Sequence, residues 1–345
     1  MLNTLLPILL FAALALAVIG AVKRFLMWRR GRPAQVDWLG GLLAMPRRYM
    51  VDLHHVVARD KYIANTHVAT AGGFVLAAVL AILVHGFGLQ SRILGFALLA
   101  ATALMFVGAL FVAKRRLDPP SRLSKGPWMR LPKSLLMFAG SFFIATLPVA
   151  GILPEGFGGW VLALLLTVGV AWGVSELFFG MTWGGPMKHA FAGALHLAWH
   201  RRSERFGGGR STGLKALNLD DPKAPLGVEK PTDFTWNQLL GFDACVQCGK
   251  CEAACPAFAA GQPLNPKKLI QDMVVGLAGG TDANFAGSPY PGKPVGEHSG
   301  GPHLPIVNLN GKALVDAETL WSCTTCRACV EECPMMIEHV DAIVD

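Results

Sequence analysis

The sequence contains eight cysteines, and all of them lie in two copies of one short pattern. Both copies read C-x2-C-x2-C-x3-C-P, a spacing that is typical of proteins that bind [4Fe–4S] clusters. The first copy holds Cys245, Cys248, Cys251 and Cys255, and the second holds Cys323, Cys326, Cys329 and Cys333. Each iron of a cubane cluster takes one soft thiolate ligand, so three closely spaced cysteines can bind three corners of one cube.

The fourth cysteine of each copy precedes a proline, and in two-cluster ferredoxins this cysteine binds the cluster of the other motif. We therefore predict one cluster on Cys245, Cys248, Cys251 and Cys333, and a second on Cys323, Cys326, Cys329 and Cys255. Structural zinc sites usually use two separated cysteine pairs, and disulfide frameworks are typical of small secreted domains. Two complete copies favour clusters and electron transfer, with clusters that only hold the fold together as the alternative.

The composition is that of a membrane protein. Of the 345 residues, 52% are hydrophobic and 16% are charged, and the mean hydropathy is +0.42; these values are outside the usual range for soluble domains. Five apolar segments of about 20 residues are long enough to cross a bilayer. They are residues 5–22, 66–89, 93–113, 134–153 and 158–180. The first segment has no basic residue before it and no clear cleavage motif after it, which indicates a retained helix and not a signal peptide.

Charge is distributed unevenly along the chain. Residues 1–236 carry 25 Lys and Arg against 11 Asp and Glu, whereas residues 237–345 carry 6 against 12. The basic residues concentrate in residues 23–65 and 114–133, which hold nine and seven. The positive-inside rule then predicts an amino terminus outside the cell and a cytoplasmic carboxyl-terminal part, in a bacterial inner membrane. We interpret this charge as orientation and lipid contact, and we expect no nucleic-acid partner.

These patterns predict an all-α protein with three parts. Residues 1–205 form a transmembrane domain of five helices plus an interfacial helix, residues 206–236 form a linker, and residues 237–345 form a two-cluster ferredoxin-like domain. A helix is expected over residues 265–275, because Asn265 can cap it and Pro266 suits its first position. The apolar spacing of Ile337, Val340, Ile343 and Val344 indicates a helix that starts in this stretch and reaches Asp345 without a capping glycine or other stop signal. We therefore expect that this chain is the front part of a longer polypeptide.

Histidines near the membrane suggest a further cofactor. His67 and His85 lie five helical turns apart on the second span, and His189, His196 and His200 share one face of the interfacial helix. His67 and one of the other three could bind haem b through two axial imidazoles. We favour the alternative that these histidines form hydrogen bonds at the interface, and a third interpretation places some of them in a quinone pocket.

Other residues could contribute to a quinone site. Glu176 lies late in the fifth span, where an acid is unfavourable unless it is paired or lines a polar cavity. It could supply a proton to a reduced quinone, or it could form an ion pair with an interfacial arginine. His54 and His55, in the first basic segment, are further candidates for quinone or proton contacts.

Several segments resemble known iron–sulfur proteins. Residues 239–256, followed by the run Pro263-Leu264-Asn265-Pro266-Lys267-Lys268-Leu269-Ile270, resemble the helical ferredoxin domain of heterodisulfide-reductase-like iron–sulfur proteins. The segment from MPRRYMVDLHH at residues 45–55 to AGGF at residues 71–74 resembles the bacterial iron–sulfur proteins of dimethylglycine catabolism. More distantly, five helices with an external amino terminus resemble the gamma subunit of nitrate reductase, a haem b protein.

The resemblance implies a membrane-bound electron carrier, the electron-transfer component of an oxidoreductase. It would take electrons from a flavoprotein, either a dehydrogenase of the methylamine type or an electron-transfer flavoprotein, and deliver them towards the membrane quinone pool. Members of these families carry Cys-Cys-Gly domains after the second cluster motif, and this sequence has none. The alternatives are a haem b-containing quinone reductase subunit and a passive membrane anchor with structural clusters.

Overall fold

The computed structural model describes residues 2–182, 184–200, 214, 219–224, 226–277, 301–307 and 314–345. Within these ranges the regular elements are helices, joined by loops and one isolated bridge between Arg32 and Thr235. The prediction of a mainly helical protein is confirmed for this part of the chain. Contacts divide the chain into two compact units, which are described separately. The first comprises Met1–Ala21, Ala58–Pro119 and Pro127–Gly185, and the second comprises Val22–Val57, Pro120–Gly126 and Pro186–Asp345.

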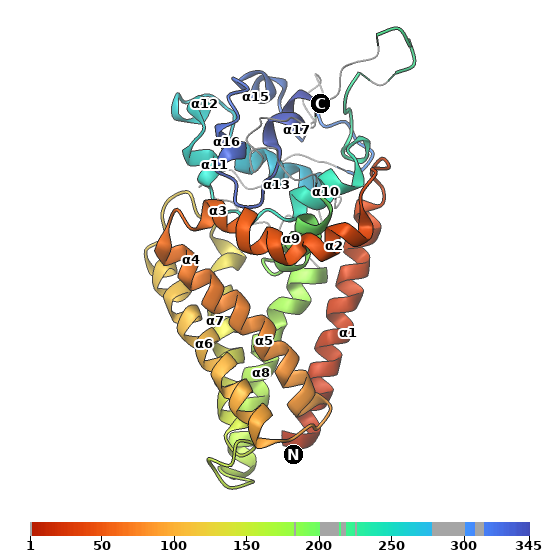
Figure 1. The fold of residues 1–345 in the computed structure, drawn as a ribbon. Helices are drawn as coiled ribbons and strands as arrows, with labels where there is room; N and C mark the ends of the chain where they lie inside the picture. The colour runs from red at the N-terminus through yellow and green to blue at the C-terminus, as the bar shows by residue number, and fades with distance from the viewer. Residues whose placement is uncertain are drawn as a thin grey trace. The chain divides into compact units, whose positions relative to one another are not determined.

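The first unit is a bundle of long apolar helices (Figure 1). Four described helices are long and apolar enough to cross a membrane. They are α1 (Leu2–Trp28), the continuous helix Lys61–Gly86, α6 (Arg92–Leu117), and the Gly159–Phe178 part of α8 (Gly159–Thr182). The helix Lys61–Gly86 joins α4 (Lys61–His67) and α5 (Gly73–Ala81) through the π-helical turns Val68–Gly72 and Ile82–Gly86. Four of the five expected spans thus coincide with spanning helices.

The remaining expected span, residues 134–153, coincides with α7 (Leu131–Thr146), which has only 16 residues. Such a helix is about 24 Å long, which is shorter than the hydrocarbon core of a typical bilayer. The chain continues from Leu147 to Gly151 as hydrogen-bonded turns. Pro148 and Gly151 lie in this stretch, and both residue types end helices. A five-helix membrane domain therefore stays a prediction.

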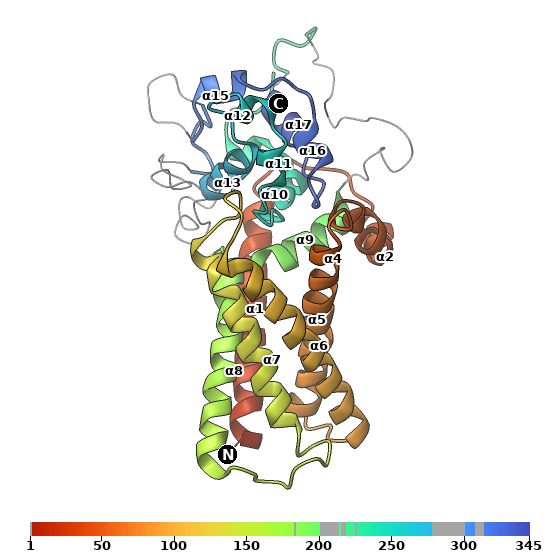
Figure 2. The ribbon, with the colours of Figure 1, turned by 90° about the vertical axis from the view of Figure 1, so that its left-hand side faces the viewer.

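Small residues bring the helices of the first unit close together. A Cβ atom at Gly173 of α8 would lie 2.6 Å from the Cβ atom of Phe138 on α7. A Cβ atom at Gly73 of α5 would lie 2.8 Å from the backbone nitrogen of Met105 on α6. Such close approach is typical of helix packing inside membranes, where van der Waals contact replaces the hydrophobic effect as the force between helices. Figure 2 shows α6, α7 and α8 side by side.

The second unit contains a run of shorter helices. They are α2 (Trp38–Arg47), the π-helix Arg48–Leu53, α3 (His54–Val57), α9 (Lys188–Trp199), α10 (Trp236–Asp243), α11 (Lys250–Ala253), α12 (Pro256–Ala259), α13 (Pro266–Leu277), α15 (Ala317–Trp321), α16 (Ala328–Glu331) and α17 (His339–Val344). The helix expected after the first cysteine motif is confirmed as α13. The backbone nitrogen of Lys268 donates a hydrogen bond of 3.0 Å to the side chain of Asn265, which precedes the helix as predicted.

Helix α9, which the sequence placed at the membrane interface, packs against α2 and α10 in this unit. Its buried side chains include Lys188, His196 and Leu197. The predicted domain limits at residues 205 and 236 stay a prediction, and most of the linker lies outside the described residues. The contacts add residues 22–57 and 120–126, which lie between apolar segments in the sequence, to the cysteine-bearing unit.

Candidate iron–sulfur centre

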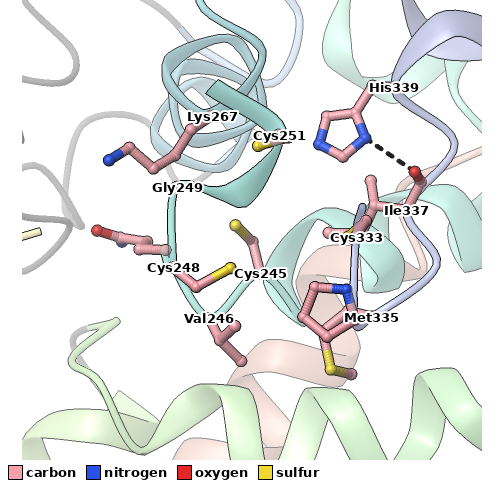
Figure 3. Close-up of a pocket in the computed structure, with 12 residues that line it drawn as sticks. Cys245, Val246, Cys248, Gly249, Cys251, Lys267, Cys333, Met335, Ile337 and His339 are labelled. Carbon is pink, nitrogen blue, oxygen red and sulfur yellow. Dashed lines mark hydrogen bonds between the residues drawn. The ribbon is translucent and has the colours of Figure 1, made fainter. Parts of the chain in front are cut away.

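Three cysteines of the first motif and one of the second surround a single pocket. Cys245, Cys248, Cys251 and Cys333 all line it, together with Lys267 and His339 (Figure 3). Cys245, Cys248 and Cys251 lie on one side of this pocket, and Cys333 approaches from the other motif. The structure therefore brings together the four residues that the spacing assigned to one cluster. This grouping is the one that the crossed arrangement predicts, in which Cys333 takes the place of Cys255.

The second set of cysteines is also close in space. Burial raises the pKa of the Cys329 thiol to about 12, and the neighbouring thiols of Cys323, Cys255 and Cys326 raise it further. Burial likewise raises the pKa of Cys323, again with contributions from Cys255 and Cys326. A thiol acts on another in this way only over a short distance. Cys255 of the first motif therefore lies near Cys323 and Cys329 of the second, in agreement with the crossed pattern.

The two motif loops have the same backbone conformation. Gln247 and Gly249 in the first loop have positive φ angles of 49° and 70°, and Thr325 and Arg327 at the equivalent positions of the second have 53° and 62°. These left-handed residues turn backbone N–H groups towards sulfur. The nitrogen of Thr325 lies 3.4 Å from Cys323 Sγ, and Gln247 makes the equivalent backbone contact to Cys245. Such N–H groups stabilise thiolate and influence the reduction potential of a bound cluster.

The two sets of cysteines adjoin each other through the short helices that follow each loop. Helix α11 contacts α16, and Cys251 and Cys329 belong to one buried apolar cluster with Val330 and Val340. The Cys329 thiol also contributes to the raised pKa of Cys251, after burial and the thiols of its own set. One side chain from each set thus contacts a shared core, and this brings the two candidate clusters near each other.

The two sets differ in their access to solvent. In the first set Cys245, Cys251 and Cys333 are buried and Cys248 is half-buried. In the second set Cys326 is exposed, Cys323 is half-buried, and Cys255 and Cys329 are buried. Burial raises the pKa of Cys245 to about 11, while Lys267 and Lys188 act in the opposite direction and favour its thiolate. Because metal binding needs thiolates, assembly of a cluster here must release protons.

Each set supplies the four thiols that a [4Fe–4S] cluster requires, one for each iron. In the described part of the chain, no three His, Cys, Asp or Glu side chains converge as the ligands of a single metal ion would. The fit to a cluster therefore rests on the grouping of the thiols and on the matching loop conformations. The assignment of individual cysteines as ligands stays a prediction.

Buried lysine and arginine contacts hold the first loop in place. Lys267 Nζ, which is buried, lies 3.0 Å from Glu252 Oε2 and also donates to the carbonyl oxygen of Arg122. The Arg122 side chain in turn donates to the carbonyl oxygen of Cys248. A Cβ atom at Gly249 would lie 2.3 Å from the Arg122 carbonyl oxygen, so the loop has no room for a side chain there.

We expect that Gly249→Ala strongly destabilises the loaded protein. Alanine at a left-handed position costs about 1–2 kcal/mol, and at residue 249 the clash with Arg122 adds to this cost. Gly261→Ala is a matched control, because Gly261 has a similar φ of +79° but nothing within 4 Å of an added Cβ atom. The measurement is the denaturant midpoint of each variant in detergent, followed by cluster absorbance. Equal losses in the two variants would contradict the role of the Arg122 contact.

A second contact joins α9 to the cysteine loop. His196 Nε2 lies 2.9 Å from the carbonyl oxygen of Met335, two residues after Cys333, and the rings of His196 and His200 stack with centroids 4.7 Å apart. Burial lowers the pKa of His196 well below its usual value, and electrostatic interactions with His200 and Arg48 lower it further. The neutral imidazole can donate its Nε2 hydrogen to this carbonyl group.

This lowered pKa predicts a loss of stability in mild acid. Below a pH of about 6.5, the unfolded chain protonates His196 and the folded chain does not, so the free energy of unfolding falls as the pH falls. His196→Gln retains a hydrogen-bond donor but cannot titrate. Between pH 6 and 5 the variant should lose about 1.4 kcal/mol less than the unmodified protein. Parallel pH profiles of the denaturant midpoint would refute this expectation.

A buried carboxylate lies beside the first motif. Asp243, two residues before Cys245, accepts a hydrogen bond of 2.8 Å from Trp28 Nε1 and lies 3.0 Å from Lys188 Nζ and 3.3 Å from Arg24 Nη1. Burial alone would raise the pKa of Asp243, but Arg24 and Lys188, together with hydrogen bonds from Lys188 and Trp28, hold it below the usual value. We call Arg24, Trp28, Lys188 and Asp243 the Asp243 cluster.

The sequence patterns above do not predict the Asp243 cluster. Arg24 belongs to the orienting basic residues of segment 23–65, and Asp243 lies in the run that leads into the first motif. The available signal was an acidic residue inside the apolar segment LLGFDA. An acid there is expected to be buried and therefore to need a cationic partner.

The remaining candidates lie at several places. His67 and His85 belong to the first unit, whereas His189, His196 and His200 belong to the second. His85 Nε2 lies 3.0 Å from the Thr146 hydroxyl group. Ring nitrogens of two histidines of the second unit contact backbone carbonyl groups: half-buried His189 that of Pro186, and buried His200 that of His196. Hydrogen bonding was the alternative we favoured for these residues, and haem binding stays a prediction.

The quinone candidates have ordinary partners as well. Glu176 is buried, and its Oε1 atom lies 3.1 Å from Arg130 Nε, the ion pair that was one of the two interpretations of this residue. His54 Nδ1 lies 2.7 Å from the carbonyl oxygen of Tyr49, and His55 is exposed. A role for these three residues in quinone or proton chemistry stays a prediction.

These features define a membrane-anchored iron–sulfur protein of the ferredoxin type. Residues 241–337 match the model of the 4Fe-4S dicluster domain, which includes both cysteine motifs. Residues 3–222 match the model described as "Domain of unknown function (DUF3483)", and this match covers more than half of the chain. The chain therefore belongs to the DUF3483 family.

Individual relatives agree with this class. A probable membrane-anchored ferredoxin of Chromohalobacter salexigens is 74% identical over 350 residues, which cover 100% of this chain and 52% of the relative. The EtfAB:quinone oxidoreductase of Syntrophomonas wolfei is 32% identical over 178 residues, which cover 50% of this chain and 24% of that protein. The probable iron-sulfur-binding oxidoreductase FadF of Bacillus subtilis is 33% identical over 198 residues, which cover 51% of this chain and 27% of FadF.

This chain spans about half the length of the first relative and about a quarter of the other two. No solved structure gives a significant match to it. The predicted resemblance to membrane-bound iron–sulfur electron carriers is confirmed by these relatives and by the 4Fe-4S domain. The membrane location is confirmed as well, by the anchored relative and by the spanning helices.

Proposed function

We propose that the protein transfers electrons through two [4Fe–4S] clusters, from a flavoprotein to the membrane quinone pool. The observation that carries this proposal is the pair of adjacent four-thiol sets in a chain with membrane-spanning helices. A [4Fe–4S] cluster carries one electron at a time, and a quinone needs two electrons and two protons to become a quinol. Two clusters in series would accept electrons one at a time from a two-electron flavin donor and deliver them one at a time to the quinone.

The difference in solvent exposure supports a direction of transfer. Electrons would be accepted at the second set, where Cys326 is exposed and Cys323 is half-buried, and would pass to the buried first set. Lys188 and Lys267 favour negative charge on Cys245 of the first set. The same positive charges would favour the reduced form of a cluster on this set, so that the electron would stay there longer than on the second set. Asp316, Glu318 and Glu331 are exposed near the second motif. This acidic surface would suit a donor with a basic docking face, because complementary charge speeds association.

The membrane orientation is part of the same proposal. The basic segments 23–65 and 114–133 support a cytoplasmic location for the cysteine-bearing unit and an external amino terminus. A cytoplasmic flavoprotein would then have direct access to Cys326. The EtfAB:quinone oxidoreductase relative is named for a donor and an acceptor of these two classes. Here they serve as the donor and acceptor to test.

The test is anaerobic mixing of the purified protein with reduced electron-transfer flavoprotein, and then with a water-soluble quinone. We expect the visible absorbance to bleach on addition of the flavoprotein and to return with quinol formation. A Cys245→Ser/Cys255→Ser variant, which lacks one thiol from each set, is the control for direct reaction of flavin with quinone. Bleaching by dithionite but not by the flavoprotein would reject this donor, and no bleaching by either reagent would reject electron transfer itself.

A further inference from the structure

Helix α2 and the turn after it expose a continuous apolar face. Its residues recur at helical spacing, and the exposed fractions of Leu39 and Leu43 are 69% and 74%. The other members of this face are Trp38, Leu42, Met50 and Val51. Arg47 is exposed near the end of the helix. A clustered apolar face of this kind is typical of an interaction surface, because scattered apolar residues on a soluble protein do not form a stripe.

The opposite face of the same segment is fixed to the second unit. A Cβ atom at Gly41 would lie 2.3 Å from the carbonyl oxygen of Ala198, so α2 and α9 pack backbone to backbone. Arg48 Nη1 donates hydrogen bonds of 2.8, 3.1 and 3.0 Å to the carbonyl oxygens of Leu197, Ala198 and His200 at the end of α9. Contacts with α9 therefore fix the orientation of α2, and its apolar face points away from the second unit.

The course of the chain indicates what covers this face. Segment 29–60 joins the end of α1 at Trp28 to the start of the next spanning helix at Lys61. Both helices are long enough to cross the bilayer, so the chain leaves the membrane and re-enters it on the same side. Helix α2 begins ten residues after α1, and a loop of that length keeps it within about 35 Å of the point of exit.

We propose that α2 lies in the headgroup layer of the membrane, with Leu39, Leu42 and Leu43 among the lipid chains and Arg47 at the phosphates. Trp38 is half exposed at the start of this face and stacks on Trp236 with centroids 5.2 Å apart. Tryptophan is enriched at this depth of a bilayer, and a helix with one apolar face and a basic residue is typical of interfacial helices. The proposal rests on membrane anchoring and is independent of the electron donor and acceptor.

The test uses a photoreactive benzophenone amino acid in the full protein, reconstituted in vesicles of phosphatidylethanolamine and phosphatidylglycerol. One variant carries it at Leu43 and the control carries it at Gln262, an exposed residue after α12. After illumination, we expect phospholipid adducts on the α2 peptide to exceed those at residue 262 at least tenfold. Equal yields of lipid adduct at the two positions would overturn the proposal. Crosslinks from residue 43 mainly to protein, whether to a second copy or to another part of the same chain, would overturn it as well.

A second measurement does not depend on the photoreactive residue. Vesicles that contain brominated lipid chains quench tryptophan fluorescence only over contact distances. Because the protein has nine tryptophans, the signal of Trp38 is taken as the difference between the unmodified protein and Trp38→Phe. We expect the quenched fraction to fall in this variant, and a fraction that stays the same would overturn the assignment of α2 to the membrane.

Discussion

Replacing Cys245 and Cys333 together is expected to leave about four irons per chain, whereas replacing Cys245 and Cys255 together is expected to leave almost none. In the structure, Cys245 and Cys333 line the same pocket, so both substitutions affect one cluster. Cys255 lies with Cys323, Cys326 and Cys329, so the second combination removes one ligand from each set. The unmodified protein should bind about eight irons, as expected for two four-iron clusters.

The two double variants are controls for each other, because each replaces two cysteines by serine. If each motif bound its own cluster, the iron contents would be reversed, with four irons in the Cys245→Ser/Cys255→Ser variant. A further control, Thr324→Ala, changes an exposed non-ligand residue in the second loop and should retain full iron content. Iron and acid-labile sulfide are measured after anaerobic reconstitution, with circular dichroism to show that both variants retain their helices. Equal iron in the two doubles would contradict the crossed arrangement.

Local patterns in the sequence were sufficient to predict the cysteine grouping. A ligand spacing of three residues and a following proline describe a loop whose geometry is nearly independent of the rest of the chain. Helix α13 was predictable for the same reason, since Asn265 caps the first turn of the helix and Pro266 is its first residue. The long apolar helices follow from composition and length alone. Where an apolar run contained Pro148 and Gly151, its length did not give the end of the helix, and α7 ends at Thr146.

Contacts between distant parts of the chain were not predictable in this way. His196 contacts the carbonyl group of Met335, 139 residues later, and Arg24 pairs with Asp243, 219 residues later. A sequence pattern gives the charge or periodicity of a residue but not its partner, so Arg24 resembles any basic residue that follows a membrane span. The role of α2 was missed for a similar reason. Its ten residues are too short for a span, and its burial against α9 depends on Gly41.

Asp243→Asn is expected to destabilise the cysteine-bearing unit by about 3–5 kcal/mol, because it removes the buried carboxylate with which two buried cations pair. Arg24 and Lys188 are buried together with Asp243, and both pair with its carboxylate. The Asp243 cluster holds two positive charges and one negative charge. Asparagine removes the charge of this carboxylate, while Trp28 can still donate to the amide oxygen that remains.

Lys188→Met should have a much smaller effect, although it removes one of the same ion pairs. Arg24 and Asp243 then form a balanced pair, and methionine fills the volume of the lysine side chain. The two variants therefore separate the cost of an unbalanced buried charge from the value of the contact. Lys268→Met is a comparison variant, because it removes a half-buried cation that lies 2.6 Å from the buried carboxylate of Asp272.

The pH dependence gives an independent measure of the same carboxylate. Because the pKa of Asp243 is lower in the folded protein than in the unfolded chain, its contribution is complete above a pH of about 4 and is lost as the pH falls through the folded value. In a plot of the free energy of unfolding against pH, Asp243→Asn should reduce the slope below a pH of about 4. His196→Gln should reduce the slope between pH 6 and 5. Denaturant midpoints of the three proteins from pH 7 down to the limit of cluster stability provide the measurement. Equal losses for Asp243→Asn and Lys188→Met at pH 7 would show that the charge balance of the cluster has no influence on stability.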